Sequence, residues 1–471
     1  MLISHGITLP YATILKRISR VPAFRALLFS ALLYLLAFQY CRIRYWRDPH
    51  SAFFDITNVY DWEYSLVREH EANHFISFHK TNDGLRPEDT VMGSNDPLIC
   101  AAFVTVKRER DDYFEQSIGS MLEGLDVRER RALHLRVLFA NTDPAIHPSW
   151  EQSWMNTAID LVESYNVSES SFRHLQQLES DRNFQEKGVL CVSHNPNFRF
   201  FFLKTPILTA LSDYVYVLDR CLTTNAPFIG IFEDDIIFAD GWMTKTLKAL
   251  IDLNPSYGPS RDQSPFESTT LESSWLYLRL FYTETLMLWG ENDFAYRNIH
   301  MVFAAAIAIG FLSLFFARRL VPGLQLDYGT IAVICLVTIP AFTGLYFMIG
   351  KYSIHPLRGL VPMDSGGCCS QALIYSRQHA SQLMEYLQEQ RSGQTDLMIE
   401  DFAAKTNLRR FALAPQQLQH IGIRSSRGAP EVNAQSTWAF WFEENDAKKL
   451  KSEHEHYLAD EKIERLLQMY E

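Results

Sequence analysis

The residues with the clearest chemical potential are three consecutive acids, Glu233-Asp234-Asp235, which lie between the apolar runs 228–232 and 236–238. In a β-strand alternate side chains share a face, so Glu233 and Asp235 are expected to point the same way and Asp234 the other way. Buried carboxylates lose their hydration and need a compensating charge. Mg²⁺ or Mn²⁺ would supply it and could hold a nucleotide diphosphate. A solvated turn after a strand is the alternative, but the apolar residues on both sides favour a metal site.

Two more polar clusters follow predicted strands. Residues 98–104 and 133–140 are apolar runs typical of buried strands, and the segment between them has apolar side chains at helical spacing. This alternation indicates an α/β fold with a mostly parallel sheet, whose ligands bind beyond the carboxyl ends of the strands. The clusters at that edge are Thr105-Val106-Lys107-Arg108-Glu109 and Asn141-Thr142-Asp143. Either one alone could be a loop that caps a helix, but with the acids they place three polar clusters at one edge.

Composition is typical of a globular protein with membrane-spanning parts. The 471 residues can form one large domain or two ordinary ones. The formal net charge is −11 and the pI is near 5.8. Because phosphate binding needs a basic surface, these values argue against nucleic acid as the main partner.

Three apolar segments are long enough to cross a bilayer, namely 24–41, 301–317 and about 330–349. Arginines rather than a small-residue cleavage site follow the first, so we expect an anchor and not a cleaved signal. The other two are joined by a short link containing Arg318 and Arg319, which predicts a membrane hairpin with a cytoplasmic turn. Buried core helices are the alternative for each segment.

Basic residues before the first segment favour a cytoplasmic N-terminus. Each membrane-spanning segment takes the chain to the other side of the membrane, so both soluble parts are expected in the lumen. There they could form one domain that is interrupted by the hairpin. The predicted organisation is a cytoplasmic N-terminus (1–23), an anchor (24–41), a lumenal stem (42–94), a first domain part (95–299), a hairpin (300–350), and a second domain part with a C-terminal tail (351–471).

The cysteines are compatible with an oxidising compartment. The number expected on the lumenal side is odd, so at least one is free or pairs elsewhere, and the pairing stays open. These residues are Cys100, Cys191, Cys221, Cys368 and Cys369. The sequon Asn166-Val167-Ser168 is also consistent with lumenal exposure.

Taken together, these motifs resemble those of a known family of enzymes. The three polar clusters, Leu408-Arg409-Arg410-Phe411, and Gln419-His420-Ile421-Gly422 with Ser425-Ser426 are similar to motifs of GT-A glycosyltransferases of the N-acetylglucosaminyltransferase IV type. The inserted hairpin and Gly367-Cys368-Cys369 narrow the resemblance to the post-GPI-attachment N-acetylgalactosamine transferase family. The resemblance implies a Rossmann-like GT-A domain with one N-terminal transmembrane helix and an inserted transmembrane hairpin.

That resemblance also implies an activity. Such an enzyme of the Golgi membrane, with its catalytic domain in the lumen, transfers a sugar with inversion to the mannose core of GPI anchors. The sugar is N-acetylgalactosamine or galactose, carried by UDP, and Mn²⁺ or Mg²⁺ is the cofactor. The expected partners are the UDP-sugar donor, the glycan of GPI-anchored proteins and membrane lipid.

The resemblance assigns roles to individual residues. Asp235 would hold the metal, with Glu233 on the same face and Asp234 nearby, and His420 would lie beside the metal or diphosphate. Gly366 and Gly367 would let the backbone approach the donor sugar, and a tight turn is the alternative for this pair. The residues implied to hold uridine and phosphate are Thr105, Lys107, Arg108, Asn141 and Asp143. Asp396 matches the catalytic base, and Glu400 and Asp401 are its rivals one turn on.

One motif points to different chemistry. His70-Glu71-Ala72-Asn73-His74 satisfies H-E-x-x-H, which on a helix presents two imidazoles to zinc with Glu71 as the general base. It predicts a membrane-anchored zinc metalloprotease, with Glu88 as a conceivable third ligand. A further alternative is a membrane protein without catalysis, in which the acids of the triplet form a structural cation site.

Overall fold

The computed structural model describes residues 21–81, 91–94, 96–108, 112–168, 172–180, 208–254, 274–287, 289–290, 293–321, 326–363, 370–390, 394–422 and 437–470. The chain divides into two compact units, and each is made of two separate stretches. The first unit contains residues 1–60 and 284–356, and the second contains residues 61–283 and 357–471.

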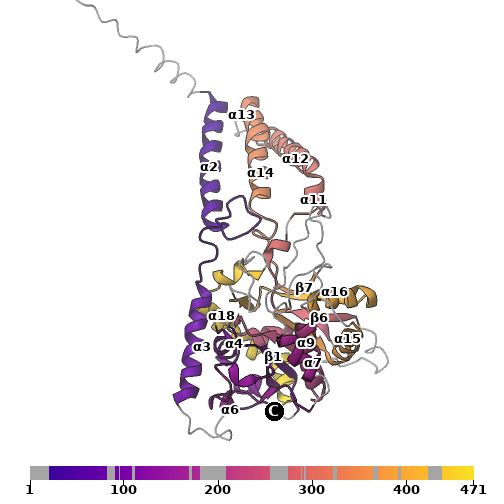
Figure 1. Ribbon diagram of the computed structural model, residues 1–471. Helices are drawn as coiled ribbons and strands as arrows, with labels where there is room; N and C mark the ends of the chain where they lie inside the picture. The colour runs from indigo at the N-terminus through magenta and orange to yellow at the C-terminus, as the bar shows by residue number, and fades with distance from the viewer. Residues whose placement is uncertain are drawn as a thin grey trace, which may run out of the picture. The chain divides into compact units, whose positions relative to one another are not determined.

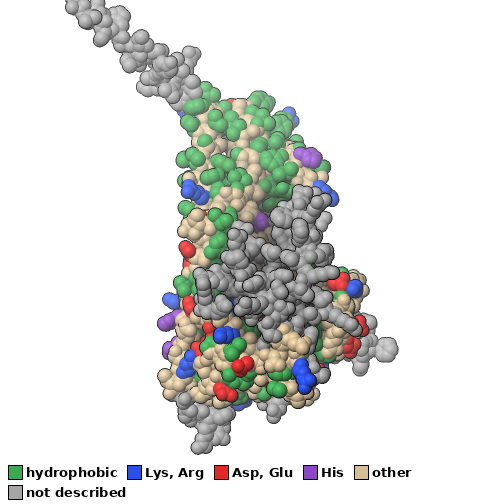
Figure 2. Space-filling model, in the orientation of Figure 1, with side chains coloured by type: hydrophobic (Ala, Val, Ile, Leu, Met, Phe, Trp, Pro, Cys, Tyr) green, Lys and Arg blue, Asp and Glu red, His purple; other side chains and the backbone are tan. Residues whose placement is uncertain are grey.

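Long apolar helices make up most of the first unit (Figure 1). Among the described residues, three helices are long and apolar enough to cross a membrane, with mean hydropathies of 1.6, 2.3 and 2.1: α2 (Pro22–Arg44), α12 (Ile299–Leu320) and the continuous helix Tyr328–Met348. The last consists of α13 (Tyr328–Val333), a π-helical turn (Ile334–Thr338) and α14 (Ile339–Met348). Hydrophobic side chains cover much of the visible face of these helices (Figure 2). The expected anchor and hairpin are therefore present as helices, and the short α11 (Phe294–Arg297) precedes the hairpin.

The second unit is built on an eight-stranded mixed sheet with the order β3-β2-β1-β4-β8-β6-β9-β7. The strands β1 to β4 pair in parallel, β8 runs antiparallel to both β4 and β6, and β9 is parallel to β6 but antiparallel to β7. The bounds are β1 (Ile99–Thr105), β2 (Leu133–Phe139), β3 (Leu161–Ser164), β4 (Phe228–Glu233), β6 (Trp275–Arg279), β7 (Gly359–Met363), β8 (Ala372–Ser376) and β9 (Arg409–Ala414). The apolar runs of the first strands are buried on both faces, as is typical of parallel strands.

Helices cover both faces of this sheet, and alternate residues of each strand enter different cores. In β1, Ile99, Ala101 and Phe103 belong to one core, whereas Cys100 and Ala102 belong to the other. The first core includes α3 (Tyr64–Thr81), α4 (Phe114–Leu122), α5 (Val127–Ala132), α6 (Met155–Ala158), α10 (Trp242–Leu253), α18 (Ala447–Leu458) and α19 (Glu461–Gln468). The second includes α7 (Phe172–Ser180), α9 (Leu208–Leu222), α15 (Arg377–Glu389) and α16 (Thr395–Thr406). The α/β class expected from the sequence is confirmed.

A separate two-stranded sheet positions His420 against the acidic triplet. The strand β5 (Ile236–Phe238) pairs antiparallel with β10 (Leu418–His420), and Ile236 lies opposite His420. The backbone amide of Ile421 then donates to the carbonyl oxygen of Asp235 over 2.8 Å. Residues almost two hundred positions apart thus meet at the carboxyl end of β4, so the site combines both stretches of the second unit.

A disulfide joins the sheet to a covering helix. Cys100 of β1 is bonded to Cys221 of α9, with their Cα atoms 5.7 Å apart. The sequence left this pairing open because five cysteines were eligible, and Cys191, Cys368 and Cys369 lie outside the described residues. Cys41 and Cys335, expected in membrane segments, are free and buried in the first unit.

We expect the Cys100→Ala/Cys221→Ala double variant to be less stable than the natural protein. The bond closes a sequence separation of 121 residues, and its loss typically costs about 2–5 kcal/mol of unfolding free energy. The measurement is the thermal unfolding midpoint of purified protein in detergent. Cys41→Ala, which removes a buried free thiol, is the control. Equal midpoints for the double variant and the natural protein would contradict the bond.

Candidate active site

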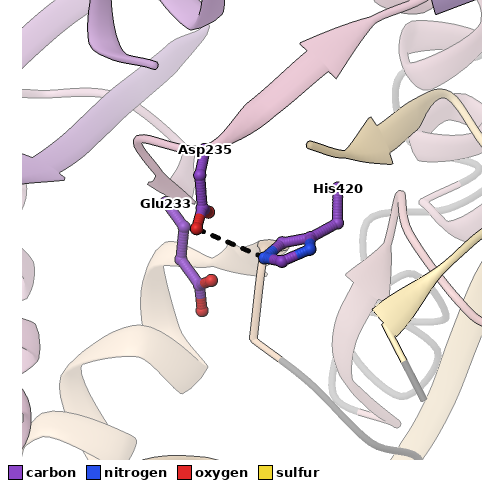
Figure 3. A group of neighbouring side chains, drawn as sticks. All are labelled: Glu233, Asp235 and His420. Atoms are coloured by element: carbon purple, nitrogen blue, oxygen red, sulfur yellow. Dashed lines mark ion pairs between the residues drawn. The ribbon is translucent and has the colours of Figure 1, made fainter. Parts of the chain in front are cut away.

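The centre of the site is a group of two carboxylates and one imidazole. The ligand atoms of Glu233, Asp235 and His420 all lie within 4.8 Å of one another (Figure 3). Glu233 ends β4, Asp235 lies in the bend before β5, and His420 ends β10. The distance from His420 Nε2 to Asp235 Oδ2 is 3.3 Å. The expected pairing of Glu233 with Asp235 on one side is observed, and His420 completes the group.

Arg108 lies against the other acids of the triplet. Its Nη2 is 3.0 Å from Asp235 Oδ2 and also contacts Asp234 Oδ1. Thr105 Oγ1 donates to Asp234 Oδ2 over 2.7 Å, so Asp234 faces the residues that follow β1. Two residues implied to bind the donor therefore contact the triplet directly.

These contacts shift the pKa values of the group. Burial alone would raise the pKa of Asp235, but His420 and Arg108 bring it below its usual value. Burial raises the pKa of Asp234, despite the opposing charge of Arg108. Burial would lower the pKa of His420, but the carboxylate of Asp235 raises it overall. Three carboxyl groups thus face one guanidinium and one imidazole.

Unpartnered buried atoms show that the group is suited to a cation and an anion. Asp235 Oδ1 is buried and accepts no hydrogen bond from any described residue. Arg108 Nε and Nη1 are likewise buried without a described acceptor. An open carboxylate oxygen beside open guanidinium donors suits a divalent cation that carries a phosphate group.

The loops after β1 and β2 are tied together by Asn141. Its Oδ1 accepts from the backbone amide of Lys107 over 2.9 Å, which aligns the two polar clusters. Asp143 caps the short 3₁₀-helix Pro144–Ile146 by accepting from the amide of Ala145. The structure therefore gives Asn141 and Asp143 backbone contacts, whereas the side chain of Lys107 is exposed.

Two parts of the site went unrecognised in the sequence. His147 Nε2 lies 3.1 Å from Thr105 Oγ1, and its ring packs against Phe114 and Phe139. Burial lowers the pKa of His147, which favours the neutral ring. Ser117 Oγ donates to the carbonyl oxygen of Asp234 over 2.7 Å and accepts from the amide of Ile236. Both belong to no motif, because only the packing of α4 and the β2 loop brings them here.

Three acids compete for the role of base, and their surroundings differ. Asp396 lies in the first turn of α16, is half-buried, and accepts from the amide of Leu397. Burial raises the pKa of Asp396. Glu400 is held by Tyr277 Oη at 2.5 Å and by Arg410 Nε at 2.7 Å. Asp401 is exposed and pairs with Lys405 at 2.7 Å, which is typical of a solvated helix surface.

The remaining predicted site residues, Gly366 and Gly367, lie outside the described residues, as do Ser425 and Ser426. Gly422, from the same motif as His420, is described and has a clear role. A Cβ atom at position 422 would lie 2.1 Å from Asp235 Oδ2. Only glycine lets the backbone come this close to the carboxylate.

The geometry of the H-E-x-x-H motif does not support a zinc protease. The motif is helical, in α3, but the side chains of His70 and His74 are exposed. Glu71 pairs instead with buried Arg68 and with Lys451, whose Nζ is 2.6 Å from its carboxylate. Within the described residues, neither histidine belongs to a metal-ligating group. The buried guanidinium of Arg68 pairs with Glu71, Glu123 and Asp240, so these acids already have a positive partner.

The fold and the site together define a membrane-bound glycosyltransferase with a GT-A domain. The family model for GPI-N-acetylgalactosamine transferase PGAP4 matches residues 99–419, so the chain belongs to that family. No curated protein matches the chain. The matched range includes the hairpin as well as the acidic triplet. The chain is accordingly a membrane glycosyltransferase that modifies GPI anchors.

We expect Gly422→Ala to weaken metal binding without unfolding the protein. The new methyl group would force the carboxylate of Asp235 to move, and displacing a ligand's support typically costs about 10–100-fold in metal affinity. Titration of Mn²⁺ followed by electron paramagnetic resonance measures this loss. Gly290→Ala, whose Cβ would come no closer than 4.0 Å to its nearest neighbour, is the matched control. Unchanged Mn²⁺ affinity in Gly422→Ala would show that Asp235 is not a ligand.

Proposed function

We propose that this protein transfers N-acetylgalactosamine from UDP to the mannose core of GPI anchors, in the Golgi lumen and with Mn²⁺. The observation that carries the proposal is the group formed by Glu233, Asp235 and His420, with its buried open oxygen on Asp235. Membership of the GPI-N-acetylgalactosamine transferase family supports the donor sugar and the acceptor.

Mn²⁺ suits this donor set better than Mg²⁺. Asp235 and Glu233 would offer carboxylate oxygens and His420 an imidazole nitrogen. Mg²⁺ prefers oxygen ligands throughout, whereas an imidazole beside carboxylates favours a softer divalent ion. The bound ion would act as a Lewis acid that stabilises the charge on the departing diphosphate.

Residues after β1 would bind the rest of the donor. Arg108 has two buried donor nitrogens without described acceptors, and a guanidinium fork fits phosphate oxygens. Lys107 adds a positive charge from the exposed side of the same loop. Thr105 and Asn141 hold these residues in place through Asp234 and the Lys107 amide, respectively. Glu233 is oriented by Ser370, whose Oγ donates to its carboxylate over 3.0 Å.

The transfer step needs a base on the acceptor side. In an inverting reaction the acceptor hydroxyl oxygen forms a bond to the anomeric carbon while the bond from that carbon to the diphosphate breaks. Asp396 would take the hydroxyl proton, and UDP would leave with the electron pair. Of the three acids, Glu400 is bound by cations and Asp401 is at the surface, so Asp396 is the best placed to accept a proton.

The Cys100–Cys221 disulfide supports a lumenal catalytic domain, because such bonds persist in oxidising compartments. The basic residues before α2 support a cytoplasmic N-terminus. The hairpin interrupts the catalytic sequence and would keep the enzyme at the bilayer, where lipid-linked acceptors are presented.

We expect Asp235→Asn to abolish transfer and Mn²⁺ binding while the protein still folds. Removing one preorganised electrostatic group from a site of this kind costs about 100-fold or more in rate. The assay measures UDP release from UDP-N-acetylgalactosamine with a GPI-glycan acceptor, in parallel with Mn²⁺ binding. UDP-galactose and UDP-N-acetylglucosamine serve as competing donors.

Asp401→Asn is the matched control, because it removes an exposed aspartate of the same unit. It should keep full activity. Normal Mn²⁺ binding and turnover in Asp235→Asn would refute the proposed metal site. Faster turnover of another UDP-sugar would instead refute only the choice of donor.

A further inference from the structure

The loop that follows β3 contains the sequence's sole Asn-X-Ser/Thr triplet in which X is not proline, at Asn166-Val167-Ser168. The side chains of all three residues are exposed. Asn166 Oδ1 accepts from the amide of Ser168 over 3.0 Å and from its hydroxyl over 2.6 Å. The amide nitrogen of Asn166 therefore remains available to solvent beside a hydroxyl that contacts its carbonyl oxygen.

Asn166 lies close to one edge of the described sheet. Among the described strands, β3 is at one edge of the eight-stranded sheet and pairs with β2 alone. Asn166 lies two residues beyond the end of this strand. A glycan attached here would meet no further strand among the described residues, and it would lie close to an edge that natural proteins commonly protect from pairing.

The compartment of Asn166 follows from a separate observation. Asn166 and the Cys100–Cys221 disulfide both lie between α2 and α12 along the chain, so they are on the same side of the membrane. A disulfide needs an oxidising compartment, and N-glycosylation occurs in the same secretory lumen.

We propose that Asn166 carries an N-linked glycan. This inference rests on the lumenal orientation included in the proposed function. The protein produced in eukaryotic cells should gain mobility on a gel after treatment with peptide-N-glycosidase F. Asn166→Gln and Ser168→Ala should each remove that shift, and Ser168→Thr should keep it. Transfer activity of Asn166→Gln should equal that of the natural protein, because the residue takes no part in the site.

An engineered sequon distinguishes a failure of the proposed modification of Asn166 from a failure of the lumenal orientation. Ala447→Thr completes a sequon with Asn445, in the second stretch of the same unit. If this variant is glycosylated and the natural protein is not, the modification of Asn166 is refuted and the lumenal orientation stands. If neither chain is glycosylated, both are refuted.

A second observation concerns the surroundings of Asp396. Asp396 and Glu400 are four residues apart on α16 and so share a face of the helix. Glu400 contacts Arg410 at 2.7 Å, Arg279 at 3.6 Å and Tyr277 Oη at 2.5 Å. The side chain of Arg279 is only 3% exposed. Two guanidiniums thus contact Glu400, and Asp396 lies one turn before it on the same helix.

We propose that Arg279 is a positioning residue that keeps Asp396 ionised for its role as base. This proposal rests on the assignment of Asp396 in the proposed function. Burial raises the pKa of Asp396, Arg279 opposes that rise, and Glu400 adds to it. The other polar neighbours of this network are Tyr277 on β6, Arg410 on β9, Tyr214 on α9 and Tyr375 on β8.

The test is the pH dependence of kcat. The base must be deprotonated, so the rate falls as pH drops through the pKa of Asp396. Arg279→Met should move this acidic limb to higher pH by about 1 unit, the usual scale for losing a neighbouring opposite charge. Arg279→Lys should keep the acidic limb close to its position in the natural protein. Arg409→Met, on the exposed neighbour that contacts Ser274 Oγ at 2.7 Å, should leave it unchanged.

Two outcomes separate this inference from the function on which it rests. If Asp396→Asn is inactive but the limb is unmoved in Arg279→Met, the role of Arg279 is refuted. If Asp396→Asn retains full activity, the base assignment itself fails. Should Arg279→Met not fold, Arg410→Met removes the other guanidinium and is expected to move the limb in the same direction.

Discussion

The second unit depends on one constraint: the negative charge of the buried acids at the end of β4 must be compensated. Asp234 and Asp235 are buried, and a buried carboxylate is tolerated only with nearby positive charge or donors. Arg108 comes from the segment after β1 in the first stretch, and His420 comes from β10 in the second stretch. Neither partner reaches the acids unless β1 lies beside β4 and β10 pairs with β5. The sheet order and the site therefore stabilise one another.

The membrane hairpin interrupts the chain without interrupting the sheet. The polypeptide leaves the second unit at Thr283, just after β6, and returns at Leu357, before β7. The strand β8 from the second stretch then inserts between β4 and β6 of the first, antiparallel to both. The first stretch alone would leave unpaired backbone groups on β4 and β6, and β8 pairs with both. This interleaving explains how a glycosyltransferase domain accommodates a hairpin, and why residues of the candidate site occur on both sides of it.

Arg68 shows why a short motif is weak evidence for a site. The sequence pattern of α3 suggested two zinc-binding histidines, yet Glu71 forms an ion pair with Arg68, one turn earlier on the helix. The buried guanidinium of Arg68 also donates to the carbonyl oxygens of Phe238 and Ser120, at 2.8 and 2.9 Å, and pairs with Asp240 at 2.9 Å. It fastens α3 to α4 and to β5. The acids around it thus stabilise the fold, whereas the acids of the triplet retain an open oxygen.

Local periodicity was enough to predict the strands at 98–104 and 133–140, the helix that begins at Phe114, and the three membrane helices. It also predicted that Glu233 and Asp235 lie on the same side. Hydrophobic spacing is a property of neighbouring residues, so the sequence contains it directly. Only the tertiary structure decided four other features. They are the Cys100–Cys221 pair, the contact of His147 with Thr105, the need for glycine at 422, and the different surroundings of Asp396, Glu400 and Asp401. Each depends on which distant segments pack together, and that is set by the summed burial and pairing of the whole domain rather than by any local pattern.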